Sequence, residues 1–172
     1  LKYRHPVPQM KRINKRALVA LCAERNGLVV SLSRLVQFGK PEEEIQRKHH
    51  ACVSVDAAFI SNTVIGAEAS EVFRQGVEAY GQFGYPDQWK YHHQGGAAGY
   101  RSREYIADFD CKEKVQQNQV FAWNPSITGT KSEDTFLVTP KGQEIMTEIE
   151  GWPTISVEIG NQIIRRPDIL VL

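Results

Sequence analysis

Two adjacent histidines are the residues of this chain best suited to move a proton. His92 and His93 stand in a stretch that reads YHHQGGAAGY over residues 91–100. Imidazole changes its charge close to neutral pH, so either ring can act as a general acid or base. We therefore interpret His92 and His93 as catalytic candidates. The alternative is structural, because a histidine pair at a strand end often only hydrogen-bonds a main-chain carbonyl group.

Other polar residues follow at intervals and complete the candidate site. Glu133 stands in the stretch GTKSEDTFLVT over residues 129–139, and it is a third catalytic candidate that can orient a substrate or its water. We expect these residues to come from neighbouring strands and to ring one concavity. An arginine there can bind a carboxylate through two hydrogen bonds, but it cannot act as a base. The ligand-binding candidates of this set are Arg101, Arg103, Glu104 and Asn124.

Small residues occupy positions 95–99, which read Gly-Gly-Ala-Ala-Gly. A glycine-rich loop can cradle a phosphate with its main-chain N–H groups, but neither G-x-G-x-x-G nor G-x-x-x-x-G-K-[ST] spacing is present. The small residues are more readily explained by a close approach of the strand to a neighbour or to a ligand.

The stretches around His92, Asn124 and Glu133 together resemble the creatinase and aminopeptidase family, which has the "pita-bread" fold. Its members carry H-G-x-G-H-G-I-G, then an I-E-P stretch, then G-x-R-x-E-D-x-x-x-V. Residues 20–41 resemble the family stretch D-x-G-x-x-Y-N-G-Y-x-S-D-x-T-R-T-F-x-x-G-K-P. The resemblance covers about residues 5–150 and implies an α+β fold, a curved antiparallel sheet with two helices packed outside.

Peptidases of that family bind two metal ions through two Asp, one His and two Glu, and most of these ligands are replaced here. The resemblance places Ala20 and Ser31 at the two Asp, Gly96 at the ligand His, and Asn124 at the first Glu. Only Glu133 is retained, which cannot hold a divalent ion alone, so we predict no metal and no other cofactor. Arg103 stands where the peptidases have a second catalytic histidine. His5 matches a histidine before the first Asp and is a further ligand-binding candidate.

Two functions remain open on this basis. The first is a pseudo-enzyme that binds a peptide or a small amide-bearing ligand in the old active-site pocket, or binds a protein partner. The second is a metal-independent hydrolase of a small amide or guanidino compound, in which His92 or His93 is the acid or base and Arg101 or Arg103 binds a carboxylate. An active metallopeptidase is a distant third.

Composition limits the remaining choices. The chain has 172 residues, of which 41% are hydrophobic and 24% charged, as is usual for one soluble domain. A net charge of +1 argues against a nucleic-acid partner, and no apolar stretch approaches the roughly 20 residues of a membrane span. Three cysteines without C-x-x-C spacing suit the cytoplasm. We expect Cys22 and Cys52 in the core and Cys111 more exposed. Relatives allow a homodimer.

Turn and helix signals give the order of elements. Residues 17–23 are typical of a buried strand, and Asn26-Gly27 predicts a hairpin returning through 28–36. Pro41 suits the first position of a helix to about Asn62, and a second helix is expected over about 69–83. A β-rich half ends in a hairpin of residues 154–159 and 162–166. We expect residues 1–172 to be the C-terminal portion of one pita-bread domain whose opening helices and first strand precede Leu1.

Overall fold

The computed structural model describes residue 10 and residues 12–172. Their two α-helices are α1 (Glu43–Asn62) and α2 (Ala69–Gln82), and a 3-10 turn, η1, covers Gln88–Tyr91. The strands are β1 (Arg16–Arg25), β2 (Leu28–Gln37), β3 (Gly95–Ala98), β4 (Val120–Trp123), β5 (Ser126–Ile127), β6 (Thr130–Lys131), β7 (Asp134–Thr139), β8 (Gly142–Ile145), β9 (Thr154–Ile159), β10 (Gln162–Pro167) and β11 (Leu170–Val171). Among the described residues, no helix is long and apolar enough to cross a membrane.

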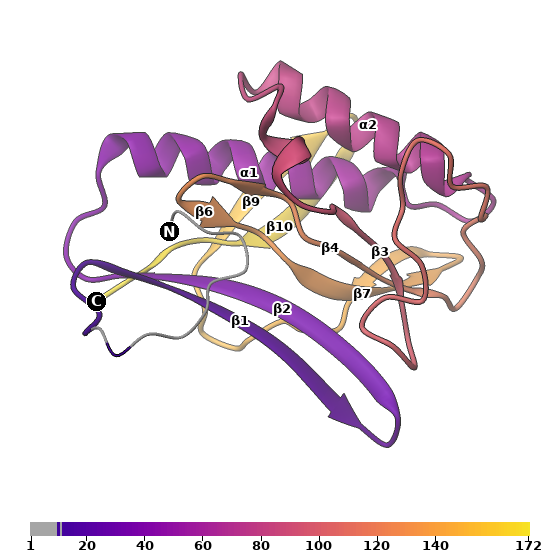
Figure 1. Cartoon of the computed structure of the whole chain (residues 1–172), viewed down its shortest axis with the longest axis horizontal. Helices are drawn as coiled ribbons and strands as arrows, with labels where there is room; N and C mark the ends of the chain where they lie inside the picture. Colours follow the sequence, from indigo (N-terminus) through magenta and orange to yellow (C-terminus); the bar gives the residue numbers. More distant parts are fainter. Residues whose placement is uncertain (1–9, 11) are drawn as a thin grey trace.

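A long curved hairpin, β1–β2, forms one side of the molecule (Figure 1). Asn26 and Gly27 form its turn at φ 51° and 77°, the left-handed conformation that a two-residue hairpin turn needs. β11 adds to the other edge of β2 in parallel, with Leu170 opposite Val36. The hairpin predicted at Asn26-Gly27 is therefore confirmed.

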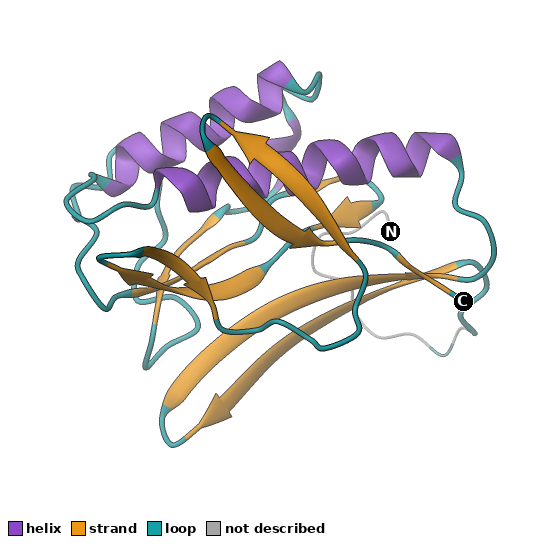
Figure 2. Ribbon diagram, turned by 180° about the vertical axis from the view of Figure 1, so that it is seen from behind, coloured by secondary structure: helices purple, strands orange, loops and turns teal. Residues whose placement is uncertain are grey.

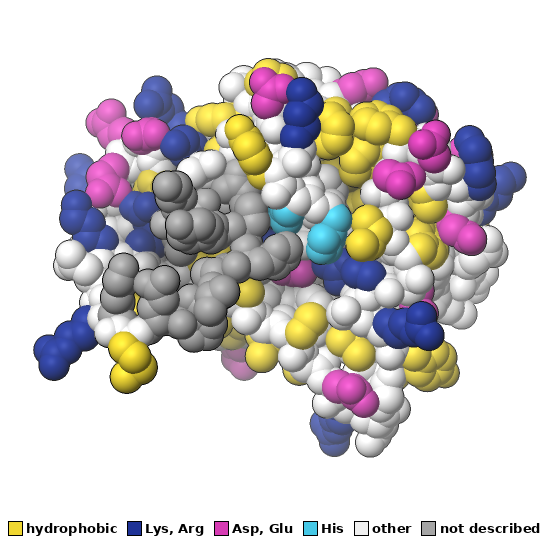
Figure 3. Space-filling model, viewed as in Figure 1, with side chains coloured by type: hydrophobic (Ala, Val, Ile, Leu, Met, Phe, Trp, Pro, Cys, Tyr) yellow, Lys and Arg dark blue, Asp and Glu magenta, His cyan; other side chains and the backbone are white. Residues whose placement is uncertain are grey.

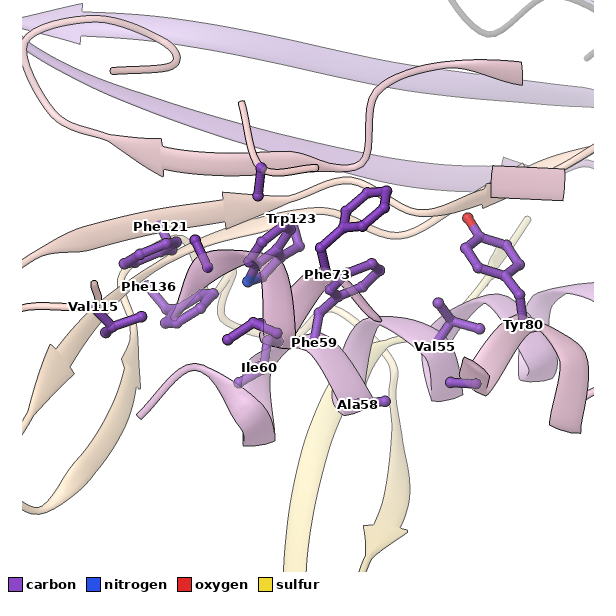
Figure 4. Close-up of a cluster of buried hydrophobic side chains, with 14 of the residues drawn as sticks. Val55, Ala58, Phe59, Ile60, Phe73, Tyr80, Val115, Phe121, Trp123 and Phe136 are labelled. Atoms are coloured by element: carbon purple, nitrogen blue, oxygen red, sulfur yellow. The ribbon is translucent and has the colours of Figure 1, made fainter. Parts of the chain in front are cut away.

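An antiparallel sheet of four strands, in the order β3-β4-β7-β8, lies between the helices and that hairpin (Figure 1). The core fills the space between α1, α2 and this sheet (Figure 4). Phe59 of α1 stacks on Trp123 of β4 with ring centroids 4.6 Å apart. The expected α+β fold, with an antiparallel sheet and two helices packed on it, is confirmed.

The two helices pack closely because one residue in their interface has no side chain. A Cβ atom added at Gly76 of α2 would lie 2.1 Å from the Phe59 ring, so only glycine allows this contact. Gly84, at φ 85°, then ends the α2 region as predicted. α1 starts two residues later than Pro41 suggests, because Glu42 is its N-cap and Pro41 precedes the helix.

The C-terminal hairpin β9–β10 crosses the outer side of α1 (Figure 2). Val157 of β9 packs there against Val53 and Ala57, which point away from the main core. α1 is therefore covered on both sides, and all its residues from Ala51 to Ile60 are buried. The hairpin predicted around Gly160-Asn161 is confirmed.

Two expectations about burial are wrong. The strand predicted as buried at residues 17–23 forms β1, but its residues from Val19 onward are exposed, because β1 pairs only with β2 and its outer edge has no described partner. Cys22 lies on this strand and is exposed rather than in the core. Cys52 is buried as expected, and Cys111 is half-buried.

Candidate functional site

A cavity of about 250 Å³ lies between the β1–β2 hairpin and the strands that follow β3. It contains four of the residues singled out from the sequence as catalytic or ligand-binding, together with two positions of replaced metal ligands, Ala20 and Ser31. Its lining consists of Ala20, Leu21, Cys22, Ser31, His93, Ser102, Arg103, Asn124, Lys131 and Glu133.

Glu133 is the best-connected side chain in this cavity. Its Oε2 accepts hydrogen bonds from Lys131 Nζ at 2.7 Å and from Ser33 Oγ at 2.7 Å. Its Oε1 accepts one from Arg103 Nη2 at 3.0 Å. Glu133 and Lys131 are buried, so water screens these interactions little. Each carboxylate oxygen therefore has its own cation.

The protonation state of Glu133 follows from this environment. Burial by itself would raise the pKa of the carboxyl group, because it disfavours the charged form. Lys131 lowers the pKa through its charge and its hydrogen bond. The hydrogen bond from Ser33 and the charge of Arg103 lower it further. The net result is a pKa below the ordinary value, so Glu133 is a carboxylate at neutral pH.

Strand geometry explains why these groups meet. Ser33 of β2 forms an isolated antiparallel bridge with Glu133, and Ser33 N donates to Glu133 O at 3.0 Å. Lys131 is two residues before Glu133, and alternate residues of an extended chain point to the same side. The bridge therefore brings the middle of the hairpin against the segment that joins β6 to β7.

Asn124 and Arg103 line the cavity, and each has one buried hydrogen-bonding atom without a partner among the described residues. Asn124 is 2% exposed, and its Oδ1 has no hydrogen-bond donor among the described residues. Arg103 Nε is also buried and has no acceptor in that part of the chain. An unpaired buried polar atom is costly, so Asn124 Oδ1 and Arg103 Nε are the candidate acceptor and donor of this site.

The two histidines have different places. His93 lines the cavity, whereas His92 is not among its lining residues. His92 Nε2 donates to the main-chain carbonyl of Asn124 at 2.9 Å, and its Nδ1 lies 3.4 Å from Nε2 of the buried Gln94. His92 therefore makes the main-chain hydrogen bond of the structural interpretation, and this bond ties His92 to Asn124. Figure 3 shows histidine side chains at the surface in the middle of this face, with acidic and basic side chains beside them.

The expected single ring of polar residues is therefore only partly formed. His93, Arg103, Asn124 and Glu133 come together, but Arg101 and Glu104 do not line the cavity. Glu104 Oε1 instead accepts hydrogen bonds from the main-chain N–H groups of Tyr100 and Arg101, at 2.8 and 3.1 Å, and holds the turn after β3. The position of His5 lies outside the described residues.

Gly96 stands at the position that the resemblance matches to the family's ligand histidine, and the structure leaves no room for a side chain there. Its φ is 154°, and a Cβ atom built there would lie 2.3 Å from the main-chain oxygen of Tyr105. At Gly95, a Cβ atom would lie 2.2 Å from the oxygen of Ala122. The small residues thus allow two main chains to approach each other, and a larger residue at Gly96 would need the segment around Tyr105 to move.

Sequence reasoning missed Lys131, Ser33 and Cys22. Lys131 had a usable signal, because a basic residue two positions before a buried acid shares its face on an extended strand. No local signal marks Ser33, because its contact with Glu133 spans 100 residues of sequence. No local signal marks Cys22 either, because the apolar run around it predicts a core position.

Comparison with known proteins identifies the family. The model of metallopeptidase family M24 matches residues 2–140, most of the chain. The chain belongs to metallopeptidase family M24. An uncharacterized peptidase of Staphylococcus epidermidis is 26% identical over 129 residues, which are 69% of this chain and 35% of that protein. The chain thus spans about a third of the length of this relative.

Solved structures of a prolidase and an Xaa-Pro dipeptidase share the fold. The prolidase from Thermococcus sibiricus superposes with a TM-score of 0.79 at 18% identity, covering 98% of this chain and 43% of that one. The Xaa-Pro dipeptidase from Bacillus anthracis gives 0.79 at 17%, covering 98% and 45%. The resemblance to the creatinase and aminopeptidase family is thereby confirmed.

The residues of this M24 chain do not fit a pair of metal ions. Ala20 and Ser31 have no carboxylate, a side chain at Gly96 is blocked, and both oxygens of Glu133 already bind cationic side chains. No group of three or more His, Cys, Asp or Glu in the described part of the chain is arranged to hold a metal. Divalent ions require several such donors.

Proposed function

We propose that this M24 homologue binds a small amide-bearing ligand, such as a short peptide, without a metal ion. The observation that carries the proposal is the Glu133 carboxylate, which binds Lys131 on one oxygen and Arg103 on the other. The cationic side chains of Lys131 and Arg103 compensate the negative charge of Glu133, so this carboxylate needs no metal ion to balance it.

The unused atoms suit an amide. Asn124 Oδ1 requires a donor and Arg103 Nε requires an acceptor, and an amide group offers both, one on its nitrogen and one on its oxygen. A guanidinium ligand is disfavoured, because Lys131 and Arg103 already neutralise the acid that would attract it.

The size of the cavity narrows the ligand further. Its volume of about 250 Å³ is below the roughly 300–1,000 Å³ of typical ligand sites. A dipeptide or a smaller amide fits this space better than a long peptide does.

The first test uses isothermal titration calorimetry on the full chain, with and without EDTA, and its probes are glycyl-alanine and alanyl-alanine, whose amide nitrogen carries a hydrogen. We expect saturable binding that EDTA does not change, and mass spectrometry should find the dipeptides intact. Asn124→Ala should weaken binding about tenfold, since it removes one hydrogen bond in a buried site. Asn161→Ala, in the exposed β9–β10 turn, is the matched control.

Two outcomes would overturn this proposal. The first is metal bound in stoichiometric amount and lost on Glu133→Ala. The second is cleavage of either dipeptide that EDTA abolishes.

A second candidate is a metal-independent hydrolase of a small amide, with His93 as acid or base. It is favoured by the position of His93 in the same cavity as Arg103 and Asn124. EDTA-resistant cleavage that His93→Ala abolishes and His50→Ala leaves unchanged would support it. Cleavage that persists in His93→Ala would exclude this mechanism.

We further propose that the protein is cytoplasmic. All three cysteines are free thiols, which is the usual state in a reducing compartment.

A further inference from the structure

A second cavity, of about 460 Å³, lies on the opposite side of the junction between β2 and β7. Consecutive residues of an extended chain point to opposite sides, so Glu133 lines the first cavity and Asp134 the second. The same alternation applies on β2, where Ser33 contacts Glu133 and the next residue, Arg34, lines the second cavity. The lining of the second cavity includes Arg34, Asp134, Ile145, Ile149, Trp152 and Arg166.

Two buried arginines form the polar wall of this cavity. Arg34 is 3% exposed and Arg166 is fully buried. They share the carboxylate of Asp134, because Arg34 Nη2 lies 2.7 Å from Oδ1 and Arg166 Nη2 lies 2.9 Å from Oδ2. Arg166 also binds Oδ2 of Asp56 through Nε and Nη2, at 3.0 and 2.6 Å. The shared carboxylate places the two guanidinium groups side by side.

Each arginine nevertheless has one nitrogen without a partner. Arg34 Nε and Arg166 Nη1 are buried and have no hydrogen-bond acceptor among residues 10 and 12–172. Every other guanidinium nitrogen of the two side chains has one. A buried N–H group without an acceptor destabilises the folded state, and more so when it is charged. A ligand with hydrogen-bond acceptors can satisfy both nitrogens.

The rest of the cavity is apolar toward one end and mixed at the rim. The Trp152 ring lies over Arg34, with 6.0 Å from its centroid to Cζ, and Ile145 and Ile149 extend this surface. Arg165 and Glu148 face each other at the rim, 3.7 Å apart. Glu148 and Glu150 repel a dianion such as phosphate more strongly than a monoanion, and Arg165 offsets the charge of Glu148.

We propose that this cavity is a second ligand site, which takes a small monocarboxylate with an apolar body. The carboxylate oxygens accept hydrogen bonds from Arg34 Nε and Arg166 Nη1, and the apolar part packs on Trp152 and Ile149. The site depends on the C-terminal segment, because Trp152 and Arg166 both come from it. It is independent of the proposed function of the first cavity.

The test is calorimetric titration of the full chain with phenylacetate, phenylacetamide and inorganic phosphate. We expect phenylacetate to bind with a Kd below about 1 mM, and phenylacetamide to bind about tenfold more weakly, because a charged acceptor makes the stronger hydrogen bond. Phosphate should not compete. Ile149→Trp adds a larger side chain to the cavity wall and leaves both buried arginines unchanged in sequence, and it should weaken phenylacetate binding about tenfold or more.

The control is Ile106→Trp, which adds the same ring at an exposed position outside the cavities. Phenylacetate affinity equal in Ile149→Trp and Ile106→Trp would overturn the proposal. So would equal binding of phenylacetate and phenylacetamide, equal binding of phosphate, or no binding of phenylacetate up to about 10 mM. Cys22 lines only the first cavity, so protection of its thiol from alkylation would show that phenylacetate binds at the wrong site.

Discussion

The ammonium group of Lys131 lies 2.7 Å from Oε2 of Glu133, with both side chains buried. Replacing Lys131 with Met keeps most of the volume and removes this cation. We expect the free energy of unfolding to fall by about 3 kcal/mol, because a buried carboxylate then loses one of its two cations. Urea unfolding measures this loss. Lys48→Met is the matched control, since Lys48 and Glu44 form an exposed pair on α1 at 2.6 Å. Equal losses in both variants would contradict the assignment.

The Glu133 carboxyl group makes stability depend on pH in a defined direction. Its folded-state pKa is lowered from an ordinary value of 4.5, so the stabilisation is complete above 4.5. As pH falls further, the unfolded state takes up the proton first, and the stabilisation is lost through the folded pKa. Urea unfolding of the wild type and of Glu133→Gln from pH 7 to pH 3 should therefore give a difference that shrinks as pH falls. A difference that stays constant would refute this role.

The thiols of Cys22 and Cys52 should react very differently. Cys22 is exposed on β1. Burial raises the pKa of the Cys52 thiol to about 12, so almost no thiolate forms there at pH 8. We expect iodoacetamide at pH 8 to modify Cys22 in the native protein and to leave Cys52 unmodified, as peptide mass spectrometry would show. The fast-reacting fraction should disappear in Cys22→Ser. Modification of Cys52 at a similar rate would mean that α1 opens readily.

Replacing either of two glycines of α2 with alanine should change the stability of the protein in opposite directions. A Cβ at Gly76 would lie 2.1 Å from the Phe59 ring, so Gly76→Ala should cost about 1–3 kcal/mol through overpacking. Gly81 has open space around the same position. Gly81→Ala should stabilise α2 by roughly 0.5–1 kcal/mol, because alanine is the better helix former. Thermal unfolding of both variants tests the helix contact, and a stabilised Gly76→Ala would disprove it.

Arg166 should be far more important for stability than its neighbour Arg165. Arg166→Leu leaves the carboxylates of Asp56 and Asp134 buried without this cation, a loss expected to cost about 3–5 kcal/mol. Arg165→Leu removes only an exposed side chain 3.7 Å from Glu148, so it should change stability little. Guanidinium unfolding compares the two variants. Similar midpoints would show that the C-terminal hairpin is not held to α1 through this ion pair.

Local signals in the sequence were sufficient for most of the fold. The turn at Asn26-Gly27 requires left-handed backbone, and Gly84 ends a helix, so both act through their own residue type. The resemblance to the family also assigns other residues to four of the five metal-ligand positions, and this assignment depends only on which residues occupy the matched positions. The retained Glu133 was found in the same way.

The tertiary structure decided how that site is completed. Ser33 and Glu133 are 100 residues apart, and only the bridge between β2 and the segment before β7 brings them together. The exposure of Cys22 depends on what packs over β1, which an apolar run does not reveal. Arg166 reaches Asp56 across 110 residues because β10 crosses α1. Contacts of this kind depend on packing between distant segments, and a local pattern of residues carries no record of them.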